Sequence, residues 1–305
     1  MADLTVVILT WNEARHIERA IGAVRGIASQ IFVVDSFSTD ETVAIAKASG
    51  AIVLSNSFIN HAKQFQWALD NAPITSAWIM RLDADEVVEP DLAAEIESRL
   101  PELTSDVVGI NLRRKHIFMG RWVRHGDRYP VVLLRLWRRG FGHIGDRWMD
   151  EHMMVCGGRT VTFSGGFADV NLNDLTFFTD KHNKYATREA IAVINQRLGL
   201  FPRDQRMAAR GMSWRRRAKR AIKEHVYNRI PFEAGAGIYF VWRYIFLLGF
   251  LDGRRGLIYH FLQGGWYRFL VGAKVVELED AISHLSDRDE IARELSRLTG
   301  LKLTE

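Results

Sequence analysis

The chain has 305 residues, 48% of them hydrophobic, which is enough to bury the core of one large or two modest domains. A single cysteine, Cys156, excludes an internal disulfide framework and is typical of a reducing compartment. No apolar run approaches the roughly 20 residues that a membrane-spanning helix needs, and we expect no cleavable signal before the first strand.

The formal net charge of +5 is unevenly distributed. Residues 1–100 carry more acidic than basic side chains, whereas residues 203–229 are rich in arginine and lysine. A basic segment of this kind is typical of proteins with an anionic partner. The sequence therefore indicates a membrane surface or a nucleic acid as the partner of the C-terminal part.

Strands and helices are expected to alternate over the first ninety residues, the strands as β-branched runs and the helices by their apolar spacing. This alternation predicts a parallel sheet with right-handed crossovers, and such sheets bind ligands at the carboxyl ends of their strands. Ser38 or Thr39 is expected to cap the second helix. In chain order the elements span residues 4–10, 14–28, 30–34, 39–49, 52–54, 61–71 and a strand that begins at Trp78.

The stretch WIMRLDADEVV, residues 78–88, leads from an apolar strand into an acidic end. Side chains alternate along a strand, so Asp83 and Asp85 are expected to point the same way, with Ala84 turned aside. Two neighbouring carboxylates repel each other unless donors or a cation separate them, and a divalent ion that also holds phosphate oxygens would do so. The alternative is a solvated acidic turn before a helix that starts at Pro90.

Polar side chains follow three of the expected strand ends. No GxxxxGK or GxGxxG motif follows any strand, so phosphate is not held by a glycine-rich loop, and binding through a metal at Asp85 is the remaining solution. The polar residues at the strand ends are Thr10, Asn12, Glu13, Asp35, Asp83 and Asp85.

Three segments of residues 4–90 together resemble the nucleotide-binding half of an inverting family-two glycosyltransferase. They are LTWNEARHIERAI, VVDSFSTDETVAIA and the DxD-type LDADE. The resemblance implies an α/β protein of the GT-A fold, a Rossmann-like mixed sheet flanked by helices. It also implies Asp35 near the base of a nucleotide-sugar, Asp83 near the ribose, and Asp85 on a Mg²⁺ or Mn²⁺ that bridges the diphosphate, with Asp83 beside the metal.

The resemblance adds further donor-binding candidates. The family often has a basic or amide residue on the helix before the DxD strand, where this chain has Lys63, Gln64 and Gln66; a solvated helix face is the alternative. A Lys-His-Asn-x-Tyr stretch places Lys181 and His182 near a donor or acceptor phosphate, unless it is a plain helix start. The donor-binding set is Thr10, Asn12, Glu13, Asp35, Lys63, Gln66, Asp83, Ala84, Asp85, Lys181 and His182.

An inverting transfer needs a carboxylate to take the proton of the acceptor hydroxyl. The family places this base after the DxD, in a short acidic motif that Asp150-Glu151-His152 resembles. We favour Glu151 as the base and keep Asp150 as the second candidate. The alternative is that these residues cap a helix or pair with Arg147.

The last hundred residues differ in character. Residues 214–226 combine one apolar stripe with arginine and lysine elsewhere, which favours an anionic lipid surface. Residues 238–251, 257–262 and 266–271 are apolar clusters too short to span a membrane and suited to its interface. One alternative is a helical subdomain that buries these apolar clusters in its own core. The other is a nucleic-acid-binding module, which would have no need of the apolar clusters. Residues 277–301 are expected to form an exposed charged helix.

Bacterial envelope-polysaccharide and lipopolysaccharide transferases of the resembling family carry a similar tail with a Gly-Phe-Leu-Asp-Gly element, here residues 249–253. The likeness implies a hexosyltransferase that moves a sugar from a nucleotide-sugar, most commonly a UDP-sugar, to a lipid-linked saccharide. It implies a peripheral, monotopic protein on the cytoplasmic face of the inner membrane, with a membrane surface and no nucleic acid as partner. We expect a donor half at 1–105, an acceptor half at 106–202 and a membrane-interface region at 203–305.

Two other classes of function fit parts of the sequence. Residues 83–87 resemble the DxDxV nucleophile motif of haloacid-dehalogenase-type phosphatases, with Asp83 and Asp85 as its carboxylates, and Gly145-Asp146 with Asp150 spells their GDxxxD motif. Such an enzyme has its nucleophile after the first strand and would leave TWNE and VDSFSTDE without a role. The third class is a non-enzymatic protein that binds membranes or nucleic acid.

Overall fold

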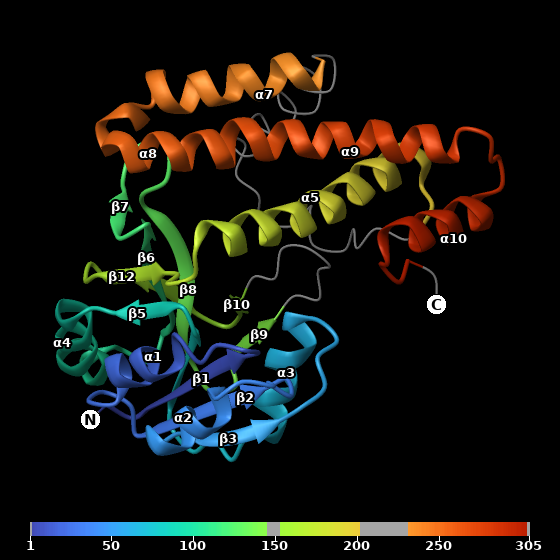
Figure 1. Cartoon of the computed structure of the whole chain (residues 1–305). Helices are drawn as coiled ribbons and strands as arrows, with labels where there is room; N and C mark the ends of the chain where they lie inside the picture. Colours follow the sequence, from blue (N-terminus) through green and yellow to red (C-terminus); the bar gives the residue numbers. More distant parts are fainter. Residues whose placement is uncertain (1, 145–152, 202–230, 304–305) are drawn as a thin grey trace. The chain divides into compact units, whose positions relative to one another are not determined.

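The computed structural model in Figure 1 describes residues 2–144, 153–201 and 231–303. The chain divides into two compact units, Met1–Asn173 and Asp174–Glu305. The first unit contains the sheet, and the described part of the second is helical. The expected halves at 1–105 and 106–202 share one sheet as far as residue 170, and the long helix at 175–198 belongs to the second unit.

The predicted alternation of strands and helices is confirmed in the first unit. Strands β3, β2, β1 and β4 lie side by side in this order and run parallel. Helix α1 is shorter than the expected 14–28. Helix α2 is not capped by Ser38 or Thr39, because its N-cap is Glu41. The elements are β1 (Leu4–Thr10), α1 (Ile17–Val24), β2 (Gln30–Asp35), α2 (Thr42–Ala48), β3 (Ile52–Ser55), α3 (His61–Asn71) and β4 (Trp78–Asp83).

The sheet continues from β4 with antiparallel and parallel partners, so the expected mixed α/β fold class is confirmed. The order after β4 is β8, β6, β12 and β5, and β7 and β11 also pair with β6, which gives ten strands within the described residues. Strands β9 and β10 form a separate pair. The elements are β5 (Glu86–Val88), α4 (Pro90–Arg99), η1 (Leu100–Glu102), β6 (Val107–Phe118), β7 (Arg121–Val123), β8 (Val131–Arg138), β9 (Gly142–Ile144), β10 (Met153–Val155), β11 (Arg159–Thr162) and β12 (Phe167–Val170).

Both faces of the central strands are buried, as is usual where helices cover both sides of a parallel sheet. On β1, Ile8 packs with Ile17 of α1 on one face, and Val7 packs with Phe65 of α3 and Trp137 of β8 on the other. The two buried faces hold the strands in register, and the register fixes which residues stand at the carboxyl edge.

The second unit consists of packed helices in its described part. Residues of α5, α9 and α10 share a core that includes Ile194, Leu278 and Leu295. The expectation of one exposed charged helix at 277–301 is wrong, because α9 ends at Ile282, α10 starts at Arg288, and both bury apolar side chains. The elements are α5 (Leu175–Leu198), α7 (Phe232–Val241), η3 (Trp242–Phe246), η4 (Gly249–Asp252), α8 (Gly253–His260), η5 (Phe261–Trp266), α9 (Tyr267–Ile282) and α10 (Arg288–Thr299).

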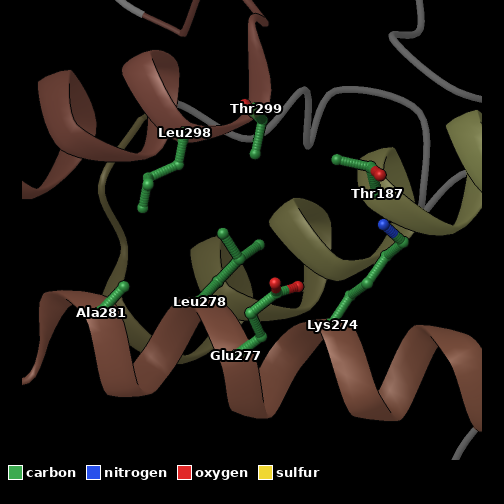
Figure 2. A pocket seen from close by; sticks show the side chains of 7 residues that line it. All are labelled: Thr187, Lys274, Glu277, Leu278, Ala281, Leu298 and Thr299. Carbon is green, nitrogen blue, oxygen red and sulfur yellow. The ribbon is translucent and has the colours of Figure 1, made fainter.

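A hollow of about 260 Å³ lies among α5, α9 and α10 (Figure 2). Lys274 and Glu277 of α9 supply its charged lining, and Leu278 and Leu298 its apolar lining. None of the residues that the sequence analysis singled out for the donor or the metal lines this hollow.

Among the described residues, no single helix is long and apolar enough to cross a membrane. One bent pair, Phe232–Phe246 with Gly249–Ile282, meets the length and composition requirements together, with a bend of 72° between its helices.

Candidate active site

Three neighbouring strand ends form one edge of the sheet in the first unit. Thr10 at the end of β1 lies beside Asp35 at the end of β2, and Leu9 lies beside Asp83 at the end of β4. Neighbouring strands are about 4.8 Å apart, so the ends of β2 and β4 are separated by about 10 Å. The structure therefore brings these polar strand ends together, as the alternation of strands and helices predicts.

Asp35 organises the loops after β1 and β2. Its buried carboxylate accepts hydrogen bonds from Thr10 Oγ1 at 3.2 Å, Ser38 N at 2.8 Å and Ser38 Oγ at 2.5 Å. Ser38 Oγ accepts from Asn12 N at 2.8 Å, and Asn12 Oδ1 accepts from Thr39 N at 2.8 Å. Thr10, Asn12 and Asp35 thus fix the geometry of this edge, and their contact with a donor stays a prediction.

Two aromatic residues that the sequence analysis did not single out lie on the same loops. Trp11 and Phe37 are both exposed, and Phe37 has a φ of 61°, a left-handed conformation that is rare and costly for a bulky residue. An exposed flat ring beside a polar edge is suited to stack on a nucleobase. The signal in the sequence is an aromatic residue one or two positions after a strand end, in TWNE and in DSFS.

Glu13 and His16 fasten the TWNE segment to the loop after β12. Glu13 Oε2 lies 2.6 Å from His16 Nδ1, and His16 Nε2 accepts a hydrogen bond from Leu172 N at 2.8 Å. Because Leu172 N can only donate, the ring proton of His16 belongs on Nδ1, which donates to Glu13. Glu13 therefore positions a buried histidine, and its expected contact with a donor stays a prediction.

The DADE segment forms a turn. Strand β4 ends at Asp83, Ala84 and Asp85 make the turn, and β5 begins at Glu86. Alternation of side chains requires an extended backbone, and Asp85 lies in the turn. The expectation that Asp83 and Asp85 point the same way because they share a strand therefore does not apply. Arg135 of β8 closes the turn, since its Nη2 donates to Asp83 Oδ2 at 2.9 Å and to Glu86 Oε1.

The cluster around Arg135 buries charges of both signs. The side chains of Arg135 and Glu86 are 7% and 1% exposed. Burial alone would raise the pKa of Asp83, but the guanidinium groups of Arg135 and Arg81 outweigh it and hold that pKa well below its usual range. Burial raises the pKa of Glu86 to about 8, with help from the charge of Asp83 and against the charge of Arg135. One arginine therefore joins two neighbouring carboxyl groups whose pKa values burial and charge shift in opposite directions.

Asp85 is half-buried and contacts the end of β12 and the loop that follows it. Its carbonyl accepts from Val170 N at 2.8 Å, and its Oδ2 accepts from Asn171 Nδ2 at 3.3 Å. Arg19 Nη2 donates to Val170 O at 2.6 Å. Burial lowers the pKa of Arg19, and the nearby charge of Asp85 opposes that shift. Arg19 thus holds the end of β12, and His16 holds the loop that follows it, the two places that contact Asp85.

Carboxylate oxygens are the ligands that Mg²⁺ and Mn²⁺ accept in proteins. Asp85 offers such a carboxylate, whereas both oxygens of Asp83 accept from arginine, Oδ1 from Arg81 Nε at 3.2 Å and Oδ2 from Arg135. The residues present therefore fit a divalent cation at Asp85 better than at Asp83. Within residues 2–144, 153–201 and 231–303, no three His, Cys, Asp or Glu side chains are arranged to hold a metal ion.

The amide residues of α3 have partners within the first unit. Gln66 Nε2 donates to Asp70 Oδ1 at 2.9 Å on the same helix. Gln64 is buried and its Nε2 donates to Ser36 Oγ at 3.1 Å, which ties α3 to the end of β2. Lys63 is exposed. The solvated-face alternative accounts for Gln66, and a donor contact of Lys63 or Gln66 stays a prediction.

Lys181 and His182 lie on α5 in the second unit. His182 Nδ1 donates to Phe178 O at 2.8 Å, and its ring stacks on that of Phe178 with 3.9 Å between centroids. Lys181 Nζ lies 5.9 Å from the centre of the Phe177 ring. Both side chains therefore pack within the second unit, and their contact with a donor phosphate stays a prediction.

The candidate bases Asp150 and Glu151, together with Gly145 and Asp146, lie outside the residues that the structure describes. The choice between Glu151 and Asp150 therefore stays a prediction from the sequence.

Comparison with known proteins finds a matching family and several relatives. A family model described as "Glycosyl transferase family 2" matches residues 5–169, more than half of the chain. An uncharacterized glycosyltransferase of Rickettsia felis is 40% identical over 97 residues, which are 32% of this chain and 34% of that protein. One of Rickettsia bellii is 42% identical over 94 residues, 31% of each chain. The matches span about a third of the length of these relatives.

Two of the matching solved structures are glycosyl-3-phosphoglycerate synthases. The mannosyl enzyme from Rubrobacter xylanophilus has a TM-score of 0.40 and 15% identity, covering 69% of this chain and 78% of that one. The glucosyl enzyme from Mycobacterium tuberculosis, in complex with Mn²⁺, UDP-glucose and glycerol 3-phosphate, has a TM-score of 0.30 and 21% identity, covering 37% and 44%. These values are too low to support an argument about activity.

Proposed function

Since the chain belongs to glycosyl transferase family 2, we propose that it is a metal-dependent, inverting transferase that moves a hexose from a UDP-sugar to a lipid-linked saccharide. Membership of this family conflicts with the phosphatase interpretation of Asp83 and Asp85 and with a non-enzymatic protein. The observation that carries the proposal is the edge where the ends of β2, β1 and β4 adjoin the turn that holds Asp85.

Each group at this edge suits one part of a nucleotide-sugar. The exposed rings of Trp11 and Phe37 suit the base by stacking. The carboxylate of Asp83 stays charged beside Arg135 and Arg81, so it can accept hydrogen bonds from ribose hydroxyls. Asp85 suits a divalent cation, which would neutralise charge on the diphosphate when bound.

The chemistry requires one proton acceptor. The acceptor hydroxyl oxygen forms a bond to the anomeric carbon while the bond from that carbon to the diphosphate oxygen breaks, and the nucleoside diphosphate leaves with the electron pair. Glu151, with Asp150 as the second candidate, takes the hydroxyl proton. The attack comes from the side opposite the leaving group, so the configuration at the anomeric carbon is inverted.

A donor panel tests this function. Thermal shifts and transfer are measured with UDP-sugars and other nucleotide-sugars in Mn²⁺, Mg²⁺ or EDTA. We expect Asp85→Ala to lose the metal-dependent shift and to lower transfer roughly 10³-fold, while Glu151→Gln binds the donor and does not transfer. Asp106→Asn, which changes an exposed aspartate paired with Arg159, is the matched control and stays active. Folded wild-type protein that binds no nucleotide-sugar and transfers none would refute the proposal.

The lipid-linked acceptor is a finer part of the proposal. It is supported by the apolar and aromatic side chains exposed on the second unit, including Trp242 and Phe246. We propose that the protein works on the cytoplasmic face of the inner membrane, in the synthesis of envelope polysaccharide or lipopolysaccharide. Radiolabelled sugar should then enter the organic-solvent extract of membranes incubated with enzyme and donor. Label that enters only water-soluble products would contradict this part and leave the transferase proposal intact.

A further inference from the structure

The second unit contains a helical hairpin with an apolar surface, residues 238–261, which we call the hairpin apex. Its first arm is the end of α7 together with η3, its link contains η4, and its second arm begins with α8 and η5. Helix α7 packs against η5 and α9, so the two arms lie side by side (Figure 1).

The first arm exposes a continuous apolar stripe. Its residues recur at helical spacings of three and four, which place them on one face. Each is between 44% and 64% exposed, and the rings of Trp242 and Phe246 stack on each other with 5.4 Å between centroids. The stripe consists of Ile238, Val241, Trp242, Ile245 and Phe246.

The link and the second arm extend this apolar surface. Leu248, Phe250 and Leu251 are exposed in the link, and Leu257 and Phe261 are exposed on α8 and η5. Scattered exposed apolar residues are normal on a soluble protein, but large contiguous patches mark interaction sites. The exposed apolar residues of the apex lie on one face of the first arm and continue through the link. They therefore form a contiguous patch, which is typical of an interaction site.

The interior of the hairpin apex is polar. Arg243, Asp252 and His260 are each at most 4% exposed. His260 Nε2 lies 3.4 Å from Asp252 Oδ2, and the guanidinium of Arg243 lies 5.6 Å from the centre of the Tyr239 ring. A Cβ added to Gly249 would lie 2.8 Å from the His260 ring, and one added to Gly256 would lie 2.3 Å from Asp252 Cβ. The two glycines therefore allow the link to close over the polar residues.

The apex thus has charged groups inside and large apolar side chains outside, the reverse of the arrangement that water favours. Hydrocarbon favours this arrangement, because polar groups are enclosed and apolar ones face the acyl chains. Two further residues limit how deep the apex can lie. Arg254 and Arg255 start α8 and are exposed, and a charged side chain is costly in the bilayer centre but favourable at anionic headgroups.

We propose that the hairpin apex is a monotopic membrane-binding surface that lies in the plane of an anionic bilayer. Its apolar stripe is buried about 5–10 Å into the headgroup and acyl-chain boundary, and Arg254 and Arg255 reach the lipid phosphates. The proposal extends the membrane localisation proposed above by naming the surface and its depth. It does not depend on the transferase chemistry, because Asp85 and the strand ends belong to the other unit.

Vesicle flotation tests the surface. Vesicles of phosphatidylethanolamine and phosphatidylglycerol at 3:1 are compared with vesicles of phosphatidylcholine alone. We expect Trp242→Asp and Phe246→Asp each to lower the vesicle partition coefficient about tenfold or more. The matched control is Leu298→Asp, since Leu298 is an exposed apolar residue of α10 in the same unit, and it binds as the wild type does. Equal losses in all three variants would refute the proposal.

The arginine pair gives a second measurement that does not disturb the apolar surface. Arg254→Gln with Arg255→Gln is expected to lower binding to the anionic vesicles about 10- to 30-fold, at about 1 kcal/mol for each charge, and to leave binding to phosphatidylcholine unchanged. Asp85→Ala, which is expected to lose transfer activity, is expected to bind vesicles as the wild type does. Loss of vesicle binding in Asp85→Ala would contradict the proposal that membrane binding by the second unit does not depend on Asp85 in the first unit.

Depth is measured with a fluorophore on a cysteine at position 246, introduced as Phe246→Cys in a Cys156→Ser background. For in-plane binding we expect stronger quenching by a nitroxide at carbon 5 of the acyl chain than at carbon 12. Stronger quenching at carbon 12 would mean a re-entrant hairpin and would overturn the in-plane geometry. Absence of quenching, with a dimer seen by light scattering that Phe246→Asp abolishes, would mean that a second copy covers the surface and would refute the proposal.

Discussion

Each unit contains a cluster of buried charged side chains, one beside a polar edge of the sheet and the other beneath an apolar surface. In the first unit Arg135 joins Asp83 and Glu86 beside half-buried polar groups at the carboxyl edge of the sheet. In the second unit Arg243, Asp252 and His260 lie beneath exposed aromatic and aliphatic side chains. A buried charge has to be compensated in either place. The surrounding exposed residues, and not the charges themselves, therefore indicate what each region contacts.

The two clusters also differ in what they position. Arg135 fixes the turn that carries Asp85, so its ion pairs set the place of a residue with a proposed chemical role. The Arg243 cluster lies inside a close-packed apex and fixes the shape of an apolar surface. Substitutions in the two regions should therefore change different measurements, catalysis and stability in the first, stability and lipid binding in the second.

The largest expected effect is at Arg135. Arg135→Met should destabilise the protein by about 3–5 kcal/mol, because it removes the ion-pair partner that the buried Glu86 shares with Asp83. Urea unfolding followed by tryptophan fluorescence measures this loss. Arg197→Met is the control, since Arg197 pairs with Glu279 at the surface and such pairs contribute about 0.2–1 kcal/mol. Similar losses in both variants would mean that the Arg135 cluster is no more than a surface ion pair.

An intermediate effect is expected at His16. His16→Leu leaves Leu172 N–H without its buried acceptor, so we expect a loss of about 1–3 kcal/mol in the free energy of unfolding. The transfer rate kcat should fall about tenfold with little change in donor KM, because His16 positions the loop that contacts Asp85.

His16→Gln is the conservative partner of this variant, because its amide oxygen can accept from Leu172 N. It should recover part of the rate and of the hydrogen-exchange protection of Leu172. A kcat that stays low although stability is recovered would contradict the positioning role assigned to the hydrogen bond between His16 and Leu172.

The smallest expected effect is at Tyr267 in the second unit. Tyr267 Oη donates to Glu189 Oε2 at 2.6 Å, so Tyr267→Phe should cost about 1–2 kcal/mol. Burial, followed by this carboxylate, raises the pKa of Tyr267 above its ordinary value. The folded protein therefore keeps the hydroxyl proton more firmly than the unfolded chain. The stability difference between wild type and Tyr267→Phe should be constant below pH 10 and shrink as the pH rises further.

Urea unfolding between pH 7 and pH 11 measures this dependence. Tyr185→Phe is the control, because Tyr185 is exposed on α5, and its stability difference from wild type should be small. A Tyr267→Phe difference that grew above pH 10 would contradict the direction assigned to the pKa of Tyr267.

The sequence by itself determined the local elements and the place of the acidic edge. Apolar runs and helical spacings gave β1, β2, β3 and α3 nearly to the residue. For β1 and β2 the signal is strong because both faces of these strands are buried and the apolar pattern has to satisfy both. The parallel order then placed Asp35 and Asp83 at one edge. The motif resemblance pointed to the family that the family model matches.

Only the tertiary structure decided which distant groups compensate the charges. Arg135 comes 52 residues after Asp83, and Leu172 comes 156 residues after His16. No local pattern specifies such partners, because they depend on which strands become neighbours in the sheet. The same limit applies at 238–251, where hydropathy gave the apolar character but not that Arg243 turns inward while Trp242 and Phe246 face outward. The spacing of apolar residues shows which side chains of one helix or strand are buried. Which charged side chains pair in the interior depends on how all the elements pack together.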